Sequence, residues 1–307
     1  MTKVFIDGSA GTTGLRIRER LSVRPDLSLI TLPEELRKDP AARADALNTA
    51  DVAFLCLPDA AAVESVSLVT SSSTVIIDTS TAHRTAGGWT YGFPELAGQR
   101  DKIAGSKRIA NPGCHASGFI ALAAPLAAAG ILDAGVRLSC FSITGYSGGG
   151  KKMIADYTAA GRDPLLDAPR QYGLSQTHKH LPEMAAVCGL QYPPVFCPIV
   201  APYYAGMEVT VPLTPADTGA SMEQIREIYR DYYRTGLVSF RDAPDESGFL
   251  SAGSMAGRDD MEISVFGQED RILLVSRFDN LGKGASGAAI QNMNLALGLD
   301  EAEGLVR

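Results

Sequence analysis

The chain has 307 residues, a net charge of -7 and a mean hydropathy of +0.03, values typical of a globular protein long enough for about two domains. Because there is no basic surplus, the totals argue against a protein that binds nucleic acid or acidic lipid.

The five cysteines are odd in number and form no C-x-x-C pair, so neither a disulfide framework nor a zinc site is expected. They are Cys56, Cys114, Cys140, Cys188 and Cys197. A reducing cytoplasm fits this pattern best. The N-terminus passes from Met1 directly into a strand-like segment, so we expect no signal peptide. The longest apolar run, Phe119–Leu132, is interrupted by proline and glycine and is too short to span a bilayer.

The first elements along the chain are typical of a dinucleotide-binding fold. Lys3–Asp7 predicts a strand and Leu15–Leu21 predicts a helix, and a glycine turn lies between them, Gly8-Ser9-Ala10-Gly11-Thr12-Thr13-Gly14. In such a unit the pyrophosphate of the cofactor lies over the helix N-terminus. The match to G-x-G-x-x-G is imperfect, because Ser9 occupies the first glycine position and Gly8 comes one residue early.

Three further strand-like runs follow, with helical stretches between them: Leu27–Leu32, Asp51–Leu57 and Thr74–Asp78. This alternation predicts an α/β Rossmann-type domain with a parallel, doubly wound sheet. The residues after the second strand should show a preference for NAD or NADP. Acidic, basic and hydroxyl groups are all present there, so these residues do not decide between NAD and NADP: Thr31, Glu34, Glu35, Arg37 and Lys38.

Cys114 follows a turn and precedes a helical run. Asn111-Pro112-Gly113 forces the turn, and His115–Ala129 predicts the helix. A thiol in the first turn of a helix lies near the positive end of the helix dipole and near unpaired amides, which favour the thiolate. Cys114 is therefore a candidate nucleophile, although many cysteines are simply small buried side chains.

The second half of the chain predicts several strands with few helices, hence an α+β domain with a mixed sheet. The expected strands are Val136–Tyr146, Val195–Val200, Met207–Leu213, Met261–Phe266 and Ile272–Phe278. A second glycine loop spans Tyr146–Lys152, and Met222–Tyr233 predicts an amphipathic helix. The last helix, Gly284–Leu297, has no strand after it, so we expect it to pack on the first domain.

Only four histidines are present, and two of them, His178 and His180, stand close to Pro182. An extended residue before Pro182 would place both on one face. Such a pair could bind a metal, but no third ligand is evident, so a general base for a thiol is the better interpretation. His115 adjoins the cysteine, but neighbours on a helix point about 100° apart, so their contact is not assured.

Together these motifs resemble the N-acetyl-γ-glutamyl-phosphate reductase family, in its shorter subtype, within the wider aspartate-semialdehyde-dehydrogenase-like group. The motifs follow the family's order along nearly the whole chain: Gly8–Gly14, Asp78–Arg84, Tyr91–Glu95, Asn111–Cys114, His178–Glu183 and Asp279–Ala285. His115 departs from the pattern, since the family often has an aromatic residue there, and Ala116-Ser117 replaces a more usual Pro-Thr.

The resemblance implies a function and a role for each matched residue. The reaction would be the NADPH-dependent reduction of N-acetylglutamyl 5-phosphate to the semialdehyde in arginine biosynthesis, with NAD not excluded. Cys114 would be the nucleophile and His180 the base, with His178 as second choice. Substrate contacts are expected from His178, Arg84, Arg108 and Lys151. Cofactor contacts are expected from Gly8, Ser9, Ala10, Gly11, Thr12, Thr13, Gly14, Cys56, Leu57, Pro58, Ser147, Gly148, Gly149, Asn280, Lys283 and Gly284.

The expected domains are a dinucleotide-binding domain at residues 1–114, completed by the C-terminal helix 283–307, and a catalytic and dimerisation domain at 115–282. A homo-oligomer is implied by the resemblance. Two alternatives stay open: an aspartate-semialdehyde dehydrogenase, which would share Cys114 and the fold, and a regulator that binds a dinucleotide without chemistry.

Overall fold

The computed structural model describes all 307 residues and divides into two units. Unit 1 contains Met1–Pro112 and Ala285–Leu305, and unit 2 contains Gly113–Gly284 and Val306–Arg307. The chain therefore passes between the units after Pro112, after Gly284 and again after Leu305.

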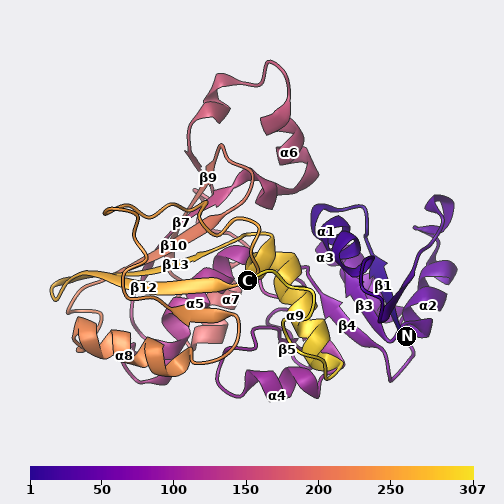
Figure 1. Ribbon diagram of the computed structural model, residues 1–307, viewed down its shortest axis with the longest axis horizontal. Coiled ribbons are helices and arrows are strands. Elements are labelled where there is room, and N and C mark those ends of the chain that lie inside the picture. Colours follow the sequence, from indigo (N-terminus) through magenta and orange to yellow (C-terminus); the bar gives the residue numbers. More distant parts are fainter. The chain divides into compact units, whose positions relative to one another are not determined.

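Unit 1 is a six-stranded sheet in the order β2-β1-β3-β4-β6-β5, and every pairing in it is parallel (Figure 1). Its strands are β1 (Thr2–Asp7), β2 (Leu27–Ile30), β3 (Val52–Leu55), β4 (Val75–Asp78), β5 (Thr90–Tyr91) and β6 (Arg108–Ala110). Its helices are α1 (Thr12–Leu21), α2 (Pro40–Thr49), α3 (Asp59–Ser67), α4 (Gln99–Ala104), α9 (Gly287–Ala296) and the short 3-10 helix η1 (Glu34–Leu36). The strands predicted in this half are confirmed.

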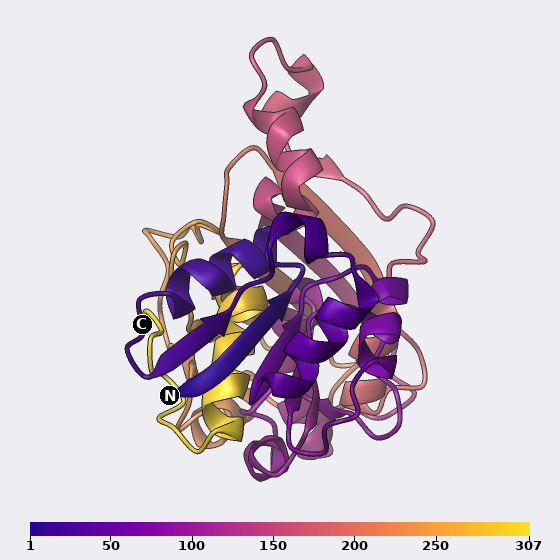
Figure 2. The same cartoon turned by 90° about the vertical axis from the view of Figure 1, so that its right-hand side faces the viewer.

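Helices cover both faces of this sheet (Figure 2). Val4 and Ile6 of β1 face one side, in a core shared with Ile290 of α9. Phe5 faces the other side, in a core shared with Leu47 of α2. The doubly wound prediction is confirmed, and so is the expectation that the last helix packs on the first domain.

The strand order fixes where a ligand would bind in unit 1. Because β2 and β3 flank β1 on opposite sides, the winding reverses at β1. In such sheets ligands bind in the crevice at the carboxyl ends of the strands at this reversal. The loop that begins at Gly8 follows β1, and Cys56-Leu57-Pro58 follows β3, so both predicted cofactor segments lie at this edge.

Unit 2 is a seven-stranded mixed sheet in the order β11-β12-β13-β10-β7-β9-β8, as predicted. Its strands are β7 (Ser139–Gly145), β8 (Arg170–Gln171), β9 (Val195–Ala201), β10 (Met207–Leu213), β11 (Val238–Phe240), β12 (Met261–Gln268) and β13 (Arg271–Phe278). Its helices are α5 (Cys114–Ala128), α6 (Gly150–Thr158), α7 (Leu181–Cys188), α8 (Met222–Tyr232) and the 3-10 helices η2 (Tyr146–Gly149) and η3 (Pro164–Asp167). The π-helix η4 (Gly282–Ser286) begins in unit 2 and ends in unit 1.

Helix α5 is the buried centre of unit 2, and it packs against α7, α8, β10 and β13. Pro125 lies inside it and has no N–H, so the carbonyl of Ala121 loses its helical partner. The hydroxyl of Tyr233 donates to that carbonyl at 2.7 Å. The helix therefore continues past the proline and holds Cys114 at the end of a rigid element. No helix in the structure combines the length and apolar character needed to cross a membrane.

Candidate functional site

Cys114 is the first residue of α5, as predicted. Gly113 before it is extended and caps the helix without a side-chain bond. The N–H of Gly113 donates to the carboxylate of Glu183 on α7 at 3.2 Å, and Glu183 is buried. A carboxylate at the N-terminal end of a helix is favoured by the helix dipole, so Glu183 holds the turn before Cys114. The sequence interpretation included Glu183 in a motif but gave it no role.

The thiol of Cys114 is half-buried, whereas Cys140 and Cys188 are buried. Burial raises the pKa of the Cys140 and Cys188 thiols far above their usual range, and it raises the pKa of the Cys56 thiol to about 12. Because the thiolate is the nucleophile, these three cysteines are poor candidates for catalysis.

His178 and His180 lie together in unit 2, just before α7. Their ring centroids are 4.7 Å apart, and the backbone N–H of His180 donates to the ring nitrogen Nδ1 of His178 at 3.2 Å. The prediction that the residue before Pro182 is extended is wrong, because that residue, Leu181, is the first residue of α7. Proline is tolerated in the first turn of a helix, where its missing N–H would have no partner. A turn, and not a strand, brings the two histidines together.

His115 lies at the centre of this cluster. Its ring centroid is 5.7 Å from that of His178 and 5.6 Å from that of His180. Its Nδ1 lies 2.6 Å from the hydroxyl of Ser142 on β7, and its Nε2 lies 2.6 Å from the hydroxyl of Tyr172 after β8. No sequence pattern marks Ser142 or Tyr172, because only the fold brings β7 and the segment after β8 to the ring of His115.

The segment at the C-terminal end of unit 2 lies directly against Cys114. A Cβ placed on Gly284, in the π-helix η4, would lie 2.9 Å from the Cβ of Cys114. Lys283 beside it is buried. The amide of Asn280 donates to the hydroxyl of Ser147 at 3.0 Å and accepts from the N–H of Gly206 at 2.9 Å. Asn280 and Ser147, two residues expected to contact the cofactor, are thus linked by a direct hydrogen bond.

The second glycine segment, Tyr146–Lys152, is helical and not the expected loop. Tyr146–Gly149 forms the 3-10 helix η2, and Gly150 begins α6. Burial of Tyr157 on one side of α6 stabilises this helix, which the glycines before it obscure in the sequence. Lys151 is therefore an exposed residue on the first turn of α6.

The first glycine loop of unit 1 packs closely on the end of β3. Gly8 has a φ of +86°, and a Cβ there would lie 2.3 Å from the carbonyl oxygen of Cys56. A Cβ on Gly14 would lie 2.5 Å from the carbonyl oxygen of Gly8. Helix α1 starts at Thr12 without a side-chain cap, and the Thr12 hydroxyl is buried with no hydrogen-bond partner. These features fit a phosphate group at the N-terminus of α1.

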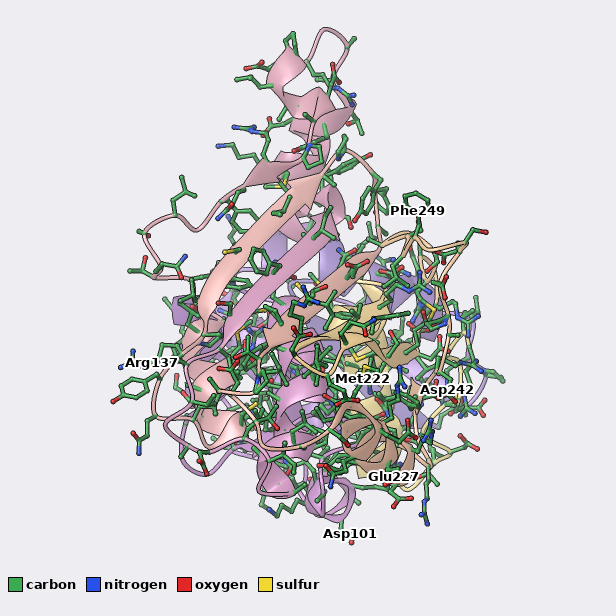
Figure 3. All side chains as sticks on the ribbon, turned by 90° about the vertical axis from the view of Figure 1, so that its left-hand side faces the viewer. Asp101, Arg137, Met222, Glu227, Asp242 and Phe249 are labelled. Carbon is green, nitrogen blue, oxygen red and sulfur yellow. The ribbon has the colours of Figure 1, made fainter.

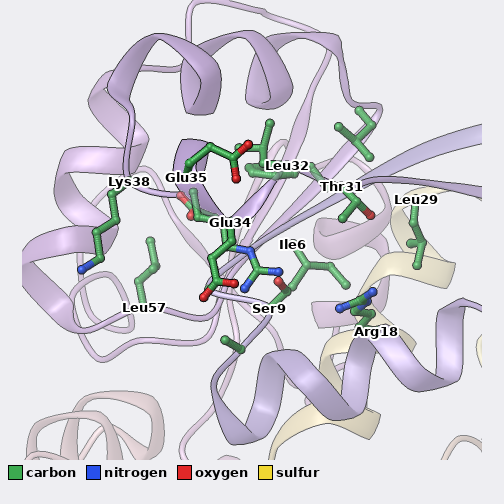
Figure 4. A pocket seen from close by; sticks show the side chains of 16 residues that line it. Ile6, Ser9, Arg18, Leu29, Thr31, Leu32, Glu34, Glu35, Lys38 and Leu57 are labelled. Carbon is green, nitrogen blue, oxygen red and sulfur yellow. The ribbon is translucent and has the colours of Figure 1, made fainter.

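A pocket of about 390 Å³ opens beside this loop (Figure 4). Gly8, Ser9, Ala10 and Leu57 line it, whereas Cys56 and Pro58 are absent from its walls. Asp7 and Arg18 also line it, together with the polar residues of mixed charge expected after the second strand: Thr31, Glu34, Glu35, Arg37 and Lys38.

Arg84 and Arg108, both expected to contact the substrate, lie in different parts of unit 1. Arg84 donates to the carbonyls of Asn111 at 3.0 Å and of Thr79 at 3.1 Å, so it holds the turn ahead of Cys114. Asn111 in turn donates to the carbonyl of Ala285 at 3.0 Å. Arg108 begins β6 and donates to the carbonyl of Thr74, before β4. Arg108 therefore lies at the amino edge of the parallel sheet, opposite the glycine loop, which speaks against a substrate contact.

Comparisons with known proteins agree with this geometry. Residues 31–106 match the model of the semialdehyde dehydrogenase NAD binding domain, and residues 114–280 match the semialdehyde dehydrogenase dimerisation domain. N-acetyl-gamma-glutamyl-phosphate reductase 2 of a Nostoc species is 45% identical over 318 residues, with 99% of each chain covered. The N-acetyl-gamma-glutamyl-phosphate reductase of Brucella anthropi is 48% identical over 307 residues, covering 96% of this chain and 98% of that one.

The chain belongs to the N-acetyl-gamma-glutamyl-phosphate reductase family. It also shares its fold with aspartate semialdehyde dehydrogenases. The enzyme of Vibrio cholerae, crystallised with a ligand abbreviated ASA, has a TM-score of 0.70 at 16% identity and covers 97% of this chain and 98% of that chain. The enzyme of Francisella tularensis has a TM-score of 0.71 at 14% identity. At such identities the likeness is one of fold, so aspartate semialdehyde dehydrogenase is a structural relative of the family found here.

Proposed function

We propose that the protein reduces N-acetyl-L-glutamyl 5-phosphate to N-acetyl-L-glutamate 5-semialdehyde and phosphate in arginine biosynthesis. The observation that carries this proposal is the half-buried Cys114 at the head of α5, beside a histidine cluster, in a chain 45–48% identical to reductases of that name.

The Cys114 thiolate attacks the acyl carbon of the substrate, and the bond from that carbon to the phosphate oxygen breaks, which leaves a thioester on the enzyme. The thiol proton passes to His180, with His178 as the second choice. The amides at the start of α5 point out of the helix and stabilise the oxyanion. When the carbon–sulfur bond of the reduced adduct breaks, the semialdehyde leaves and Cys114 is regenerated.

A bound nicotinamide dinucleotide would supply the hydride that reduces the thioester. The glycine loop and the first turn of α1 would hold its phosphates, with Thr12 as a donor. We propose NADPH as the cofactor: Thr31 directly follows β2, and the pocket that holds Glu34 and Glu35 also carries the basic side chains of Arg18, Arg37 and Lys38, which could bind the 2′-phosphate. The Arg18→Ala variant should raise the KM for NADPH more than that for NADH; equal changes would contradict this assignment.

We further propose a homo-oligomer built through the outer face of the sheet of unit 2. No helix covers β7 and β9 on that side in the view of Figure 3. Phe141 is 47% exposed, Val195 58% and Leu273 41%, and the strand register places all three on this face. Apolar side chains gathered on one face are typical of an interface between subunits, and the matched model describes a dimerisation domain.

The experiment that tests the proposed chemistry compares Cys114→Ser with Cys197→Ser, which changes another half-buried cysteine. Turnover is followed as phosphate-dependent reduction of NADP⁺ with the semialdehyde, since the acyl phosphate is labile. Cys114→Ser should lose turnover and keep cofactor binding, and Cys197→Ser should keep both. Normal turnover in Cys114→Ser would refute covalent catalysis.

A further inference from the structure

The loop that carries His178 and His180 begins where the edge strand of the unit 2 sheet stops. Strand β8 has only two residues and pairs with β9. Just after it, the N–H of Tyr172 donates to the carbonyl of Pro198 on β9 at 3.0 Å. Because a proline has no N–H to return, the antiparallel ladder is weakened at this point, and the chain leaves the sheet.

The side chain of Gln176 takes the place of a strand at the next position of β9. The chain turns back at Gly173, whose carbonyl accepts from the N–H of Gln176 at 3.0 Å. Oε1 of Gln176 then accepts from the N–H of Phe196 at 2.9 Å, and Nε2 donates to the carbonyl of the same residue at 2.7 Å. The reversed amide would place donor against donor and acceptor against acceptor, so its orientation is fixed. The side chain therefore binds both backbone groups that a longer β8 would have paired.

Gln176 holds this position in a backbone conformation that side chains rarely adopt. Its φ is +56°, and Ser247 is the only other residue besides glycines with a positive φ. This left-handed region is unfavourable for a residue with a Cβ, whereas glycine adopts it readily. Since glycine would fit this φ without strain, the glutamine contributes its amide group at this position.

The residue that Gln176 binds is also the surface on which the histidine cluster packs. The side chain of Phe196 is 1% exposed, and its ring centroid lies 5.1 Å from that of His178 and 5.2 Å from that of His115. Both contacts are edge-on, an arrangement that aromatic rings favour. His178 follows Gln176 by two residues, and its ring accepts from the backbone N–H of His180. Gln176 thus holds both the chain that leads into His178 and the ring against which His178 packs.

We propose that Gln176 is a positioning residue for the reaction: its amide, bound to Phe196, sets the position of His178 and, through that ring, of His180. This inference rests on the proposed function, which assigns the proton transfer to these two histidines. The amide itself takes no proton and acts only through the histidines. Its loss should therefore lower kcat more than it changes KM.

Two variants separate this role from a contribution to stability alone. Gln176→Met keeps the length of the side chain and removes both hydrogen bonds, whereas Gln176→Gly removes the amide and relieves the positive φ. Both should lower kcat by about tenfold or more and change the KM for N-acetylglutamate semialdehyde by less than about threefold. Gln176→Gly should nevertheless unfold at a higher urea concentration than Gln176→Met. The matched control, Gln268→Met, changes an exposed glutamine at the end of β12 and should keep the kcat of the unaltered protein.

Hydrogen exchange in the free protein, followed by NMR, separates this inference from the proposed function. In Gln176→Met the amides of Phe196 and His180 should both exchange about tenfold faster, because the first loses its acceptor and the second loses a fixed His178 ring. Faster exchange at Phe196 alone, or a kcat equal to that of Gln268→Met, would overturn the inference. Because exchange needs neither substrate nor cofactor, faster exchange at both amides in a protein without turnover would refute the proposed function and leave the link from Gln176 to the histidines in place.

Discussion

Gly284→Ala adds a single methyl group at the point where the π-helix η4 touches the nucleophile. The new Cβ would lie 2.9 Å from the Cβ of Cys114 and 3.2 Å from the carbonyl oxygen of Asp279. Separations below 3.4 Å between carbon atoms are repulsive, and neither neighbour lies on a flexible side-chain end, so the backbone near Cys114 must shift. Overpacking of this kind costs about 1–3 kcal/mol of unfolding free energy.

The effect on catalysis should exceed the effect on stability. A displacement of the nucleophile by about 1 Å can cost about a hundredfold in rate, so we expect kcat to fall by about ten- to a hundredfold. The assays are turnover, the alkylation rate of Cys114 and chemical denaturation. Gly219→Ala is the control, because a Cβ there meets nothing within 4 Å. Turnover and alkylation rates in Gly284→Ala equal to those of Gly219→Ala would refute the close packing described here.

Three further predictions concern stability, the cofactor and assembly. Because the folded pKa of His115 lies below the usual 6.5, acid protonates it only in the unfolded chain, and stability falls as pH drops. Between pH 6.5 and 5, His115→Phe should reduce that dependence by about 1 kcal/mol per pH unit on average in urea titrations. Gly14→Ala places a Cβ 2.5 Å from the Gly8 carbonyl and should weaken NADPH binding at least about tenfold by fluorescence titration. Phe141→Glu should dissociate the oligomer in analytical ultracentrifugation.

Each of these predictions has a control and a contradicting result. An unchanged pH dependence in His115→Phe would mean that the histidine is not neutral in the folded protein. Gly105→Ala, whose Cβ meets only ordinary contacts, should bind NADPH normally, and equal affinity in Gly14→Ala would contradict the phosphate site. Phe249→Glu changes a 76% exposed side chain on a loop and should leave assembly intact; the same outcome for Phe141→Glu would exclude this face as the interface.

The fold could be predicted from the sequence wherever apolar periodicity and turns carried the information. Strands β1 to β4 of unit 1, the mixed sheet of unit 2 and the helix that begins at Cys114 followed from local patterns, whereas β5 and β6, of two and three residues, were not predicted. The sequence prediction failed in two places. Leu181 begins α7 because a proline is tolerated in the first turn of a helix, and α6 forms because Tyr157 is buried.

The reactive residues of the candidate site could be predicted from the sequence motifs, but the hydrogen bonds that hold them in place could not. Cys114, His178 and His180 stand out because their residue types are reactive and rare in the chain. Ser142 and Tyr172 are ordinary residues of a strand and a loop, and only the fold brings them to the ring of His115. Glu183 likewise acquires its role through the packing of α7 beside α5.

The most direct test of the central claim is a comparison of two aldehydes in the reverse reaction. The purified protein, with phosphate and NADP⁺, is given N-acetylglutamate semialdehyde in one assay and aspartate semialdehyde in the other, and NADPH formation is followed at matched concentrations. We predict phosphate-dependent reduction of NADP⁺ with N-acetylglutamate semialdehyde and none above background with aspartate semialdehyde. A rate with aspartate semialdehyde alone would contradict the proposed substrate while leaving the fold and Cys114 in place.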